Sequence, residues 1–165
     1  MDAIEAMKTR RSVRAFTGEP VTKEQIEEIV DCGRLAANAR NRQPWEFVAV
    51  TDPTMLKKLA GVTEGRGEFV GTAGVAIVVL GVASDELYVA GCSNAAQSMM
   101  IAAHAMGLGS CWAQLDNRPF GEKVRELVGA PDTFRTLCML GIGYPMGLPD
   151  KPKRPLGEVL HWEKF

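Results

Sequence analysis

The spacing of hydrophobic residues along this chain alternates between the period of a helix and that of a strand. Ile26 and Ile29 recur at helical spacing after Thr22, which offers an N-cap with Gln25 three residues later as a capping box. This pattern predicts a helix over about 23–36. Similar signals predict shorter helices over 2–9, from Asp52-Pro53 to Gly61, and from Pro119 to Gly129 with Asp116 or Asn117 as its cap.

Strands are predicted where runs of apolar and β-branched residues lie between turn residues. Val75–Val82 is a continuous apolar run, which is typical of a central strand buried on both faces. Shorter runs predict strands over Trp45–Thr51, Ser110–Gln114 and Thr136–Ile142. The glycine-rich, polar stretch 61–72 has no such periodicity, and we expect it to be mobile.

The longest predicted helix, over about 86–106, has almost no polar face. A helix that is apolar all round must be buried by the core of its own domain or by a partner subunit. The chain thus has four or five helices and four or five short strands without a strict βαβ alternation. We expect one domain over residues 1–165, of the α+β class.

Composition excludes several classes of function. Nineteen lysines and arginines nearly balance twenty aspartates and glutamates, which argues against a broad nucleic-acid surface. No apolar run approaches the roughly 20 residues of a membrane helix, and the start of the chain lacks the apolar core of a signal peptide. We therefore expect a cytoplasmic protein with no membrane partner, whose four widely spaced cysteines are reduced thiols.

The common motifs of enzyme chemistry are missing. The chain has no phosphate-binding P-loop, and Gly141-Ile142-Gly143 is followed by Tyr144-Pro145 instead of the helix that a dinucleotide fingerprint needs. His104 and His161 share no ligand spacing, so we expect no metal site and interpret His104 as a core residue. Cys111 follows a glycine-rich turn, but a reactive thiol is the less favoured interpretation.

Two basic clusters lie at opposite ends of the chain. The early cluster includes a serine hydroxyl, and the late one is interleaved with prolines that stiffen it. Arginine forks suit bidentate contacts with phosphate oxygens, so the two clusters either bind one phosphate together or form a solvated surface. The clusters are Arg10, Arg11, Ser12 and Arg14, and Lys151, Lys153 and Arg154.

Several segments together resemble the FMN-dependent nitroreductase family. They are R-R-S-x-R at 10–14, N-R-Q-P-W at 41–45, Ala95–Ala103, G-L-G-S-C-W at 107–112 and K-R-P-L at 153–156. They occur in the order of the family and span nearly the whole chain. The resemblance implies an α+β, nitroreductase-like three-layer sandwich with a mostly antiparallel central sheet flanked by helices. It also implies an intertwined homodimer with two FMN sites at its interface.

The resemblance also implies roles for individual residues. Arg10 and Ser12 would hold the FMN phosphate and ribityl chain, Arg11 would support them, and Lys153 or Arg154 would close on the phosphate. Arg14 would lie near the pyrimidine edge, where a cation favours the reduced flavin. Trp112, Ala113 and Gln114 would run past the ring, with a backbone N–H near Gln114 facing flavin N5. The loop of the other subunit would border the ring through Asn38, Ala39, Asn41 and Gln43.

The function implied is a two-electron transfer from NAD(P)H to a nitroaromatic, quinone or flavin acceptor by a ping-pong mechanism. Because the cofactor carries the hard chemistry, no catalytic side chain is expected. The chain departs from the family at Gly91, Ser98 and Leu115, where an acid, an asparagine and a glycine are common. These departures leave open a flavin carrier without turnover. A second alternative is a relative that removes halogens, desaturates substrates or breaks down flavin, as short nitroreductase-like chains can do.

Overall fold

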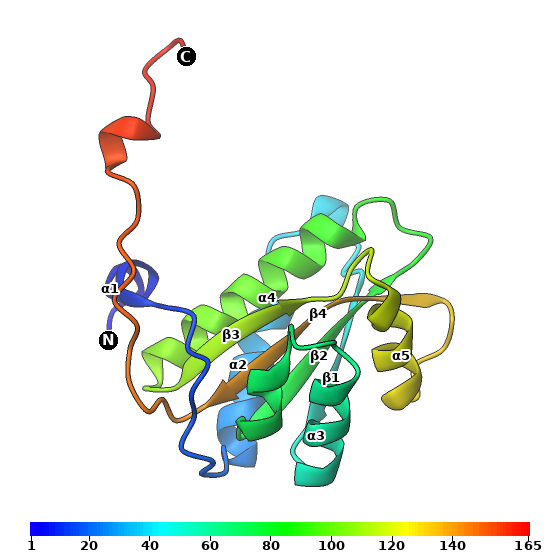
Figure 1. Cartoon of the computed structure of the whole chain (residues 1–165). Coiled ribbons are helices and arrows are strands. Elements are labelled where there is room, and N and C mark those ends of the chain that lie inside the picture. Colours follow the sequence, from blue (N-terminus) through cyan, green and yellow to red (C-terminus); the bar gives the residue numbers. More distant parts are fainter.

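One antiparallel sheet organises the chain. The computed structural model describes residues 1–165, and its four strands lie in the order β1-β2-β4-β3 with antiparallel pairing throughout (Figure 1). This arrangement confirms the predicted α+β class. The strands are β1 (Trp45–Val50), β2 (Val75–Val82), β3 (Gly109–Gln114) and β4 (Phe134–Gly143). The helices are α1 (Ala3–Thr9), α2 (Lys23–Arg34), α3 (Pro53–Gly61), α4 (Tyr88–Ala105) and α5 (Pro119–Leu127), with 3-10 turns η1 (Ala39–Asn41), η2 (Glu68–Thr72) and η3 (Leu156–Glu158).

Strand β2 explains why the sheet is covered on both faces. Its side chains alternate, so that Ile77 and Val79 lie in one apolar cluster while Val78 and Leu80 lie in the other. All four are at most 2% exposed. The continuous apolar run of the sequence therefore forms a central strand buried on both sides, as predicted.

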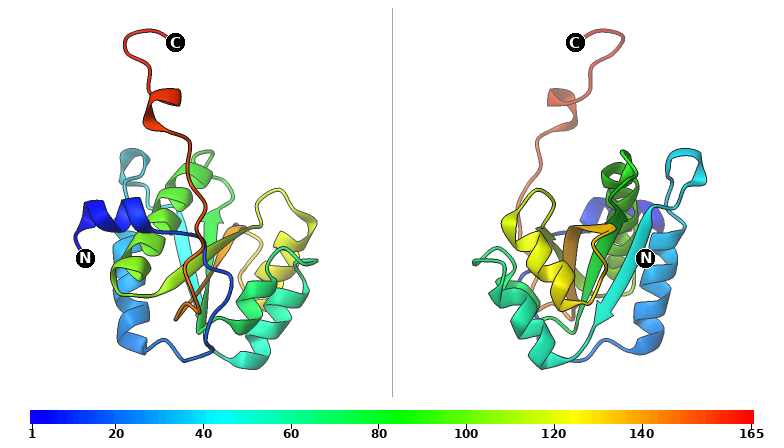
Figure 2. Two further views of the ribbon diagram at one scale, coloured as in Figure 1. Left: turned by 60° about the vertical axis from the view of Figure 1, so that its left-hand side comes forward. Right: turned by 90° about the vertical axis from the view of Figure 1, so that its right-hand side faces the viewer.

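The helices complete three layers (Figure 2). Helices α2 and α4 pack together over one face of the sheet, and α1 packs on α4. The opposite face is covered by α3, η2 and α5. The capping box predicted for α2 is present, since Gln25 N–H donates to Thr22 Oγ1 at 3.2 Å and Gln25 Oε1 accepts from Thr22 N–H at 3.0 Å.

Two local predictions are wrong. The 61–72 segment is folded onto the core, because η2 buries Phe69 and Val70 and Gly67 N–H donates to the buried Thr63 Oγ1 at 2.8 Å. Neither Asp116 nor Asn117 caps α5, whose N-cap is Arg118 without a side-chain bond.

The chain leaves the sheet after β4 and ends in an exposed tail. Every residue from 150 to 165 is exposed, and Figures 1 and 2 show this tail projecting away from the three layers. Its apolar side chains find no cover, with Leu156 70% and Trp162 76% exposed. The only helical element of the tail is the single turn η3. No helix of the chain combines the length and hydropathy that crossing a membrane requires.

Candidate functional site

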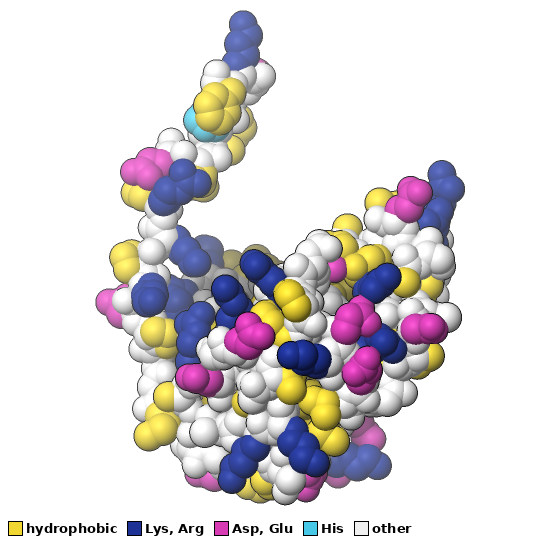
Figure 3. Space-filling model, turned by 45° about the vertical axis from the view of Figure 1, so that its right-hand side comes forward, with side chains coloured by type: hydrophobic (Ala, Val, Ile, Leu, Met, Phe, Trp, Pro, Cys, Tyr) yellow, Lys and Arg dark blue, Asp and Glu magenta, His cyan; other side chains and the backbone are white.

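The two basic clusters line one hollow. It has a volume of about 160 Å³ and is lined by Arg10, Arg11, Ser12, Arg14, Pro149, Lys151 and Lys153. These include five positively charged side chains and no acidic one, and none of the five forms an ion pair within the chain. In Figure 3 dark-blue side chains gather near the foot of the tail. We name this hollow the anion pocket.

Backbone pairing brings the two ends of the chain together at this pocket. Thr17 N–H donates to the Tyr144 carbonyl and Met146 N–H donates to the Ala15 carbonyl, each at 3.0 Å. The tail thus starts beside the early cluster. Lys151 lines the pocket together with Lys153, whereas Arg154, which the resemblance offered as an alternative to Lys153, does not.

Arg10 lines the pocket, and one of its buried donor atoms has no hydrogen-bond partner. Its Nη1 is buried and makes no hydrogen bond. Arg11, in contrast, donates from Nη1 to the carbonyls of Lys8 and Arg10, both at 3.0 Å, and so braces the backbone. Burial, and then the charge of Arg11, lower the pKa of the Arg10 guanidinium. Uncompensated positive charge and a free buried donor are what a bound phosphate would satisfy.

Strand β3 positions the early cluster. Val13 N–H donates to the Ser110 carbonyl at 2.9 Å, and Ser12 and Ser110 form a parallel bridge. A Cβ at Gly109 would lie 2.8 Å from Val13 Cβ, so only a glycine permits this approach. Ser110 Oγ is the other buried side-chain atom without a partner, which places both such atoms of the chain at this junction.

The free edge of β3 continues from the anion pocket towards Gln114. In an antiparallel strand, the N–H and C=O of one residue point to the same side, and those of alternate residues point to the same edge. The Ser110 carbonyl accepts from Val13 N–H and so points to the free edge of β3. The N–H of Gln114 therefore points there too, while Leu115 N–H bonds to β4 at 3.0 Å. From Ser110 to Gln114 the strand spans about 13 Å. Trp112 Nε1–H donates to Gln114 Oε1 at 2.8 Å, which couples these two side chains.

The side chains of Cys111 and Ala113, between Ser110 and Gln114, lie on the opposite face of the sheet from that of Trp112. Ala113 and Cys111 belong to the apolar cluster on the opposite face of the sheet, and each is at most 2% exposed. Burial raises the pKa of the Cys111 thiol, although the charges of Arg14 and Arg10 oppose this. The thiol is therefore protonated at neutral pH and is no nucleophile.

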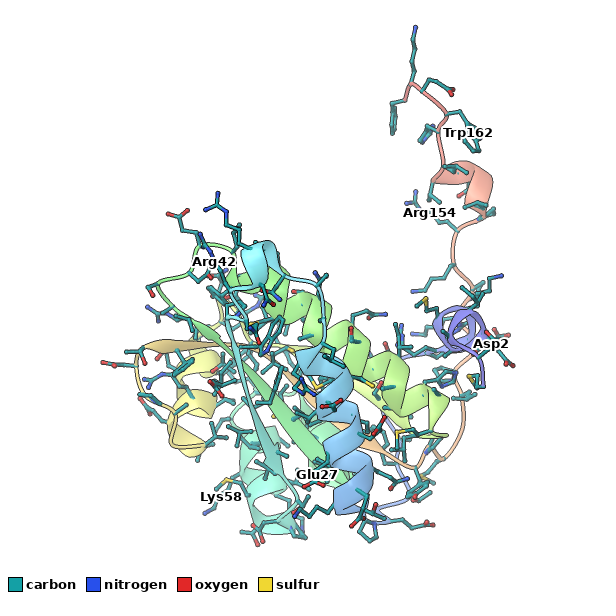
Figure 4. The ribbon with its side chains drawn as sticks, turned by 180° about the vertical axis from the view of Figure 1, so that it is seen from behind. Asp2, Glu27, Arg42, Lys58, Arg154 and Trp162 are labelled. Carbon is teal, nitrogen blue, oxygen red and sulfur yellow. The ribbon has the colours of Figure 1, made fainter.

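Within one chain, the loop before β1 lies far from the free edge of β3. The 38–43 loop precedes the edge strand β1, which three strand spacings, about 14 Å, separate from β3. In Figure 4 the labelled Arg42 and Asp2 mark opposite ends of α4. One chain alone therefore does not bring the residues predicted for the far side of the flavin (Asn38, Ala39, Asn41 and Gln43) to the edge that carries Gln114.

This loop is strained and firmly held. Arg40, Asn41 and Gln43 adopt φ of 52°, 53° and 51°, which is unfavourable for residues other than glycine. Asn38 Oδ1 accepts from Gln43 N–H at 2.8 Å. A Cβ at Gly91 of α4 would come within 3.0 Å of Pro44 Cγ, so the glycine that departs from the family pattern leaves room for this loop.

A larger hollow, of about 520 Å³, lies where β3 ends and α5 begins. Tyr88 Oη and Asn117 Nδ2 donate to the two carboxylate oxygens of Asp116, at 2.6 and 2.8 Å. Arg125 and Arg135 occupy both oxygens of Glu122. Since its carboxylates are already satisfied, this hollow has the character of a structural network, and the anion pocket is the better candidate site.

Comparisons with known proteins agree with this geometry. The model of the nitroreductase family matches residues 7–65 and 55–144. A protein of Methanothermobacter thermautotrophicus, provisionally named NADH dehydrogenase/NAD(P)H nitroreductase, is 34% identical over 100% of this chain and 88% of its own. The FMN reductase (NADPH) of Bacillus subtilis is 27% identical over 97% of this chain and 73% of its own. The solved FMN-dependent nitroreductase of Clostridium difficile R20291 superposes with a TM-score of 0.91 at 29% identity, covering 98% of this chain and 99% of that one.

Proposed function

The chain belongs to the nitroreductase family and is an NAD(P)H-dependent oxidoreductase, and we propose that it uses FMN bound along the free edge of β3. The observation that carries the proposal is the continuity of this edge. At one end lies a pocket with five cationic side chains that form no ion pair. At the other end lies the backbone N–H of Gln114, which points to the free edge about 13 Å from Ser110. The site would belong to a single FMN-binding domain over residues 1–165.

The residues of the pocket fit a phosphate monoester. Arg10 offers its buried, unpaired Nη1, Ser12 offers a hydroxyl, and Lys151 and Lys153 approach from the tail. Charge-assisted hydrogen bonds of this kind are the strong ones. Arg14 lines both this pocket and an adjoining hollow of about 520 Å³, which gives the rest of the cofactor room.

Bound there, FMN would supply the two-electron chemistry between NAD(P)H and the acceptor. The protein would bind and orient it: the free N–H of Gln114 is available to the ring, and the indole of Trp112 lies beside it on the strand. Donor and acceptor would take turns at one exposed face, in a ping-pong order. Nitroaromatics, quinones and free flavins are the acceptors we propose.

A second copy of the chain would complete the site. The 38–43 loop is held in a strained conformation. Within its own chain it lies beside the edge strand β1, whereas Gln114 lies on β3 at the opposite edge of the sheet. The tail exposes apolar side chains that include Leu156 and Trp162. A homodimer that buries the tail and places the loop of one subunit at the β3 edge of the other accounts for both features.

The test is a visible spectrum of the purified protein, loaded with FMN, desalted, made anaerobic and mixed with NADH or NADPH. A retained flavin band that bleaches supports the proposal, and product analysis with candidate acceptors then separates reduction from dehalogenation or flavin breakdown. A retained band that neither donor bleaches favours the flavin-carrier alternative. Absence of a retained band contradicts the proposal.

The phosphate assignment is tested by Arg10→Ala. Loss of its charge-assisted bonds, worth about 1.5–3 kcal/mol, should weaken FMN binding by roughly 10- to 150-fold. Arg34→Ala is the matched control, because Arg34 lies on α2 and pairs only with Asp31 at the surface. Equal FMN affinity of the two variants would contradict the assignment.

A further inference from the structure

His104 lies in the last turn of α4 and is 8% exposed. Its Nε2 is 2.8 Å from Thr9 Oγ1, at the end of α1, and Thr9 Oγ1 also donates to the Glu5 carbonyl at 2.7 Å. Because a hydroxyl has one hydrogen and a carbonyl only accepts, the bond to Thr9 must be donated by Nε2–H of the imidazole. The neutral ring therefore carries its hydrogen on Nε2 and leaves Nδ1 as a free base.

This bond fastens the end of α1 to α4 immediately before the anion pocket begins. Arg10 follows Thr9 directly, and its backbone N–H caps α1 by donating to the Ala6 carbonyl at 3.0 Å. Ala6 is the only buried residue of α1. Because α1 has so little apolar packing, the His104–Thr9 bond is a principal constraint on the position of the backbone of Arg10.

We propose that His104 is a positioning residue of the flavin phosphate site and that its Nδ1 takes up a proton from solvent when an anion occupies the pocket. The charged groups whose fields act on the imidazole are Arg10 and Arg11, which follow α1, and Glu5, on α1. A bound dianion offsets the field of the two arginines and so favours the imidazolium. The inference rests on the proposed function, since it identifies the flavin phosphate as that anion.

The free protein keeps this ring neutral. Burial, then Arg10 and Arg11, lower the pKa of His104, and Glu5 only partly opposes them. Linkage is reciprocal, so an anion that raises this pKa binds more tightly as the ring becomes protonated. Each pKa unit gained on binding corresponds to about a tenfold gain in anion affinity at acidic pH.

The experiment follows the chain's two imidazoles by NMR between about pH 5 and pH 8, with and without sulfate. Sulfate is the probe because it stays doubly ionised over this range. We expect His104 to titrate below the usual histidine range and to move upward with sulfate. His161→Gln assigns the two signals. An unmoved His104 signal overturns the inference.

Two variants separate positioning from proton uptake. His104→Gln keeps an N–H donor for Thr9 but cannot titrate, whereas His104→Leu keeps neither property. Because the flavin phosphate itself titrates near pH 6, each variant is compared with the wild type. The glutamine variant should bind FMN like the wild type at about pH 8 and lose roughly tenfold relative to it at about pH 5. The leucine variant should bind more weakly at every pH, and the control variant Arg34→Ala should match the wild type.

The outcomes are distinct. A glutamine variant with the pH dependence of the wild type overturns proton uptake, and a folded leucine variant with unchanged FMN affinity overturns positioning. If sulfate moves His104 but the protein retains no FMN, the proposed function fails and the proton linkage stands. If FMN binds and His104 does not move, only the present inference fails.

Discussion

A single methyl group added at Gly109 should disturb the proposed flavin site without altering any side chain expected to bind the flavin. The new Cβ would lie 2.8 Å from Val13 Cβ and 2.9 Å from both of its Cγ atoms. Val13 is branched and 2% exposed, so no rotamer change clears all three contacts. Overpacking of this kind costs about 1–3 kcal/mol. Since Val13 N–H is bonded to Ser110, the neighbouring Arg10 and Ser12 must move with it.

Urea unfolding and flavin titration of Gly109→Ala, Val13→Ala and the double variant measure this coupling. Val13→Ala alone should cost about 2 kcal/mol, because it removes two buried carbon groups. The double variant lacks two of the three short contacts, so its loss should fall short of the sum by about 0.5–3 kcal/mol and part of the FMN affinity should return. Gly61→Ala is the control, because nothing lies within 4 Å of a Cβ there. Additive losses together with normal FMN affinity in Gly109→Ala would refute the reasoning.

Three further outcomes are expected. Tyr88→Phe should lower the free energy of unfolding in urea by about 1 kcal/mol, because Asp116 loses its 2.6 Å bond, while FMN affinity stays unchanged; undiminished stability would contradict the structural role of this pair. Asn38→Ala removes the acceptor of Gln43 N–H, so trypsin should cut the strained loop faster than in the wild type, and equal rates would show that this bond does not hold it. In the free protein the lowered pKa of His104 makes the folded state harder to protonate than the unfolded one, so stability should fall as pH drops below about 6.5. His104→Gln should flatten this fall in urea titrations at several pH values, and an unchanged slope would contradict it.

Local signals in the sequence predicted most of the fold. The apolar run of β2 and the capping box at Thr22 act within a few residues, and both occur as expected. The errors have long-range causes. Asp116 bonds to Tyr88 across the end of the sheet instead of capping α5, and Phe69 is buried although its neighbours are glycine-rich and polar. No periodicity reveals such contacts, because they depend on which elements become neighbours in space.

The sequence predicted the candidate residues of the site but not their position relative to one another, because that position depends on long-range contacts. Both basic clusters stand out in the sequence, but only the pairing of 15–17 with 144–146 shows that they meet. Lys151 and Lys153 line the pocket and Arg154 does not. The proline-rich segment that carries these three residues forms no strand, so no strand periodicity could have selected the two lysines in advance. The bound FMN, the residues that contact it, the homodimer and the identity of the acceptor stay predictions.

Under the proposed function, the free edge of β3 also bears on the fate of the protein when flavin is scarce. The segment around Ser12 covers only the start of this strand, and unpaired strand edges invite other chains to pair with them. A flavin lying along the edge would shield it as well as carry electrons. Newly made chains that find no cofactor would then be drawn into aggregates instead of waiting as an empty reserve, so the supply of FMN would set how much of this protein survives.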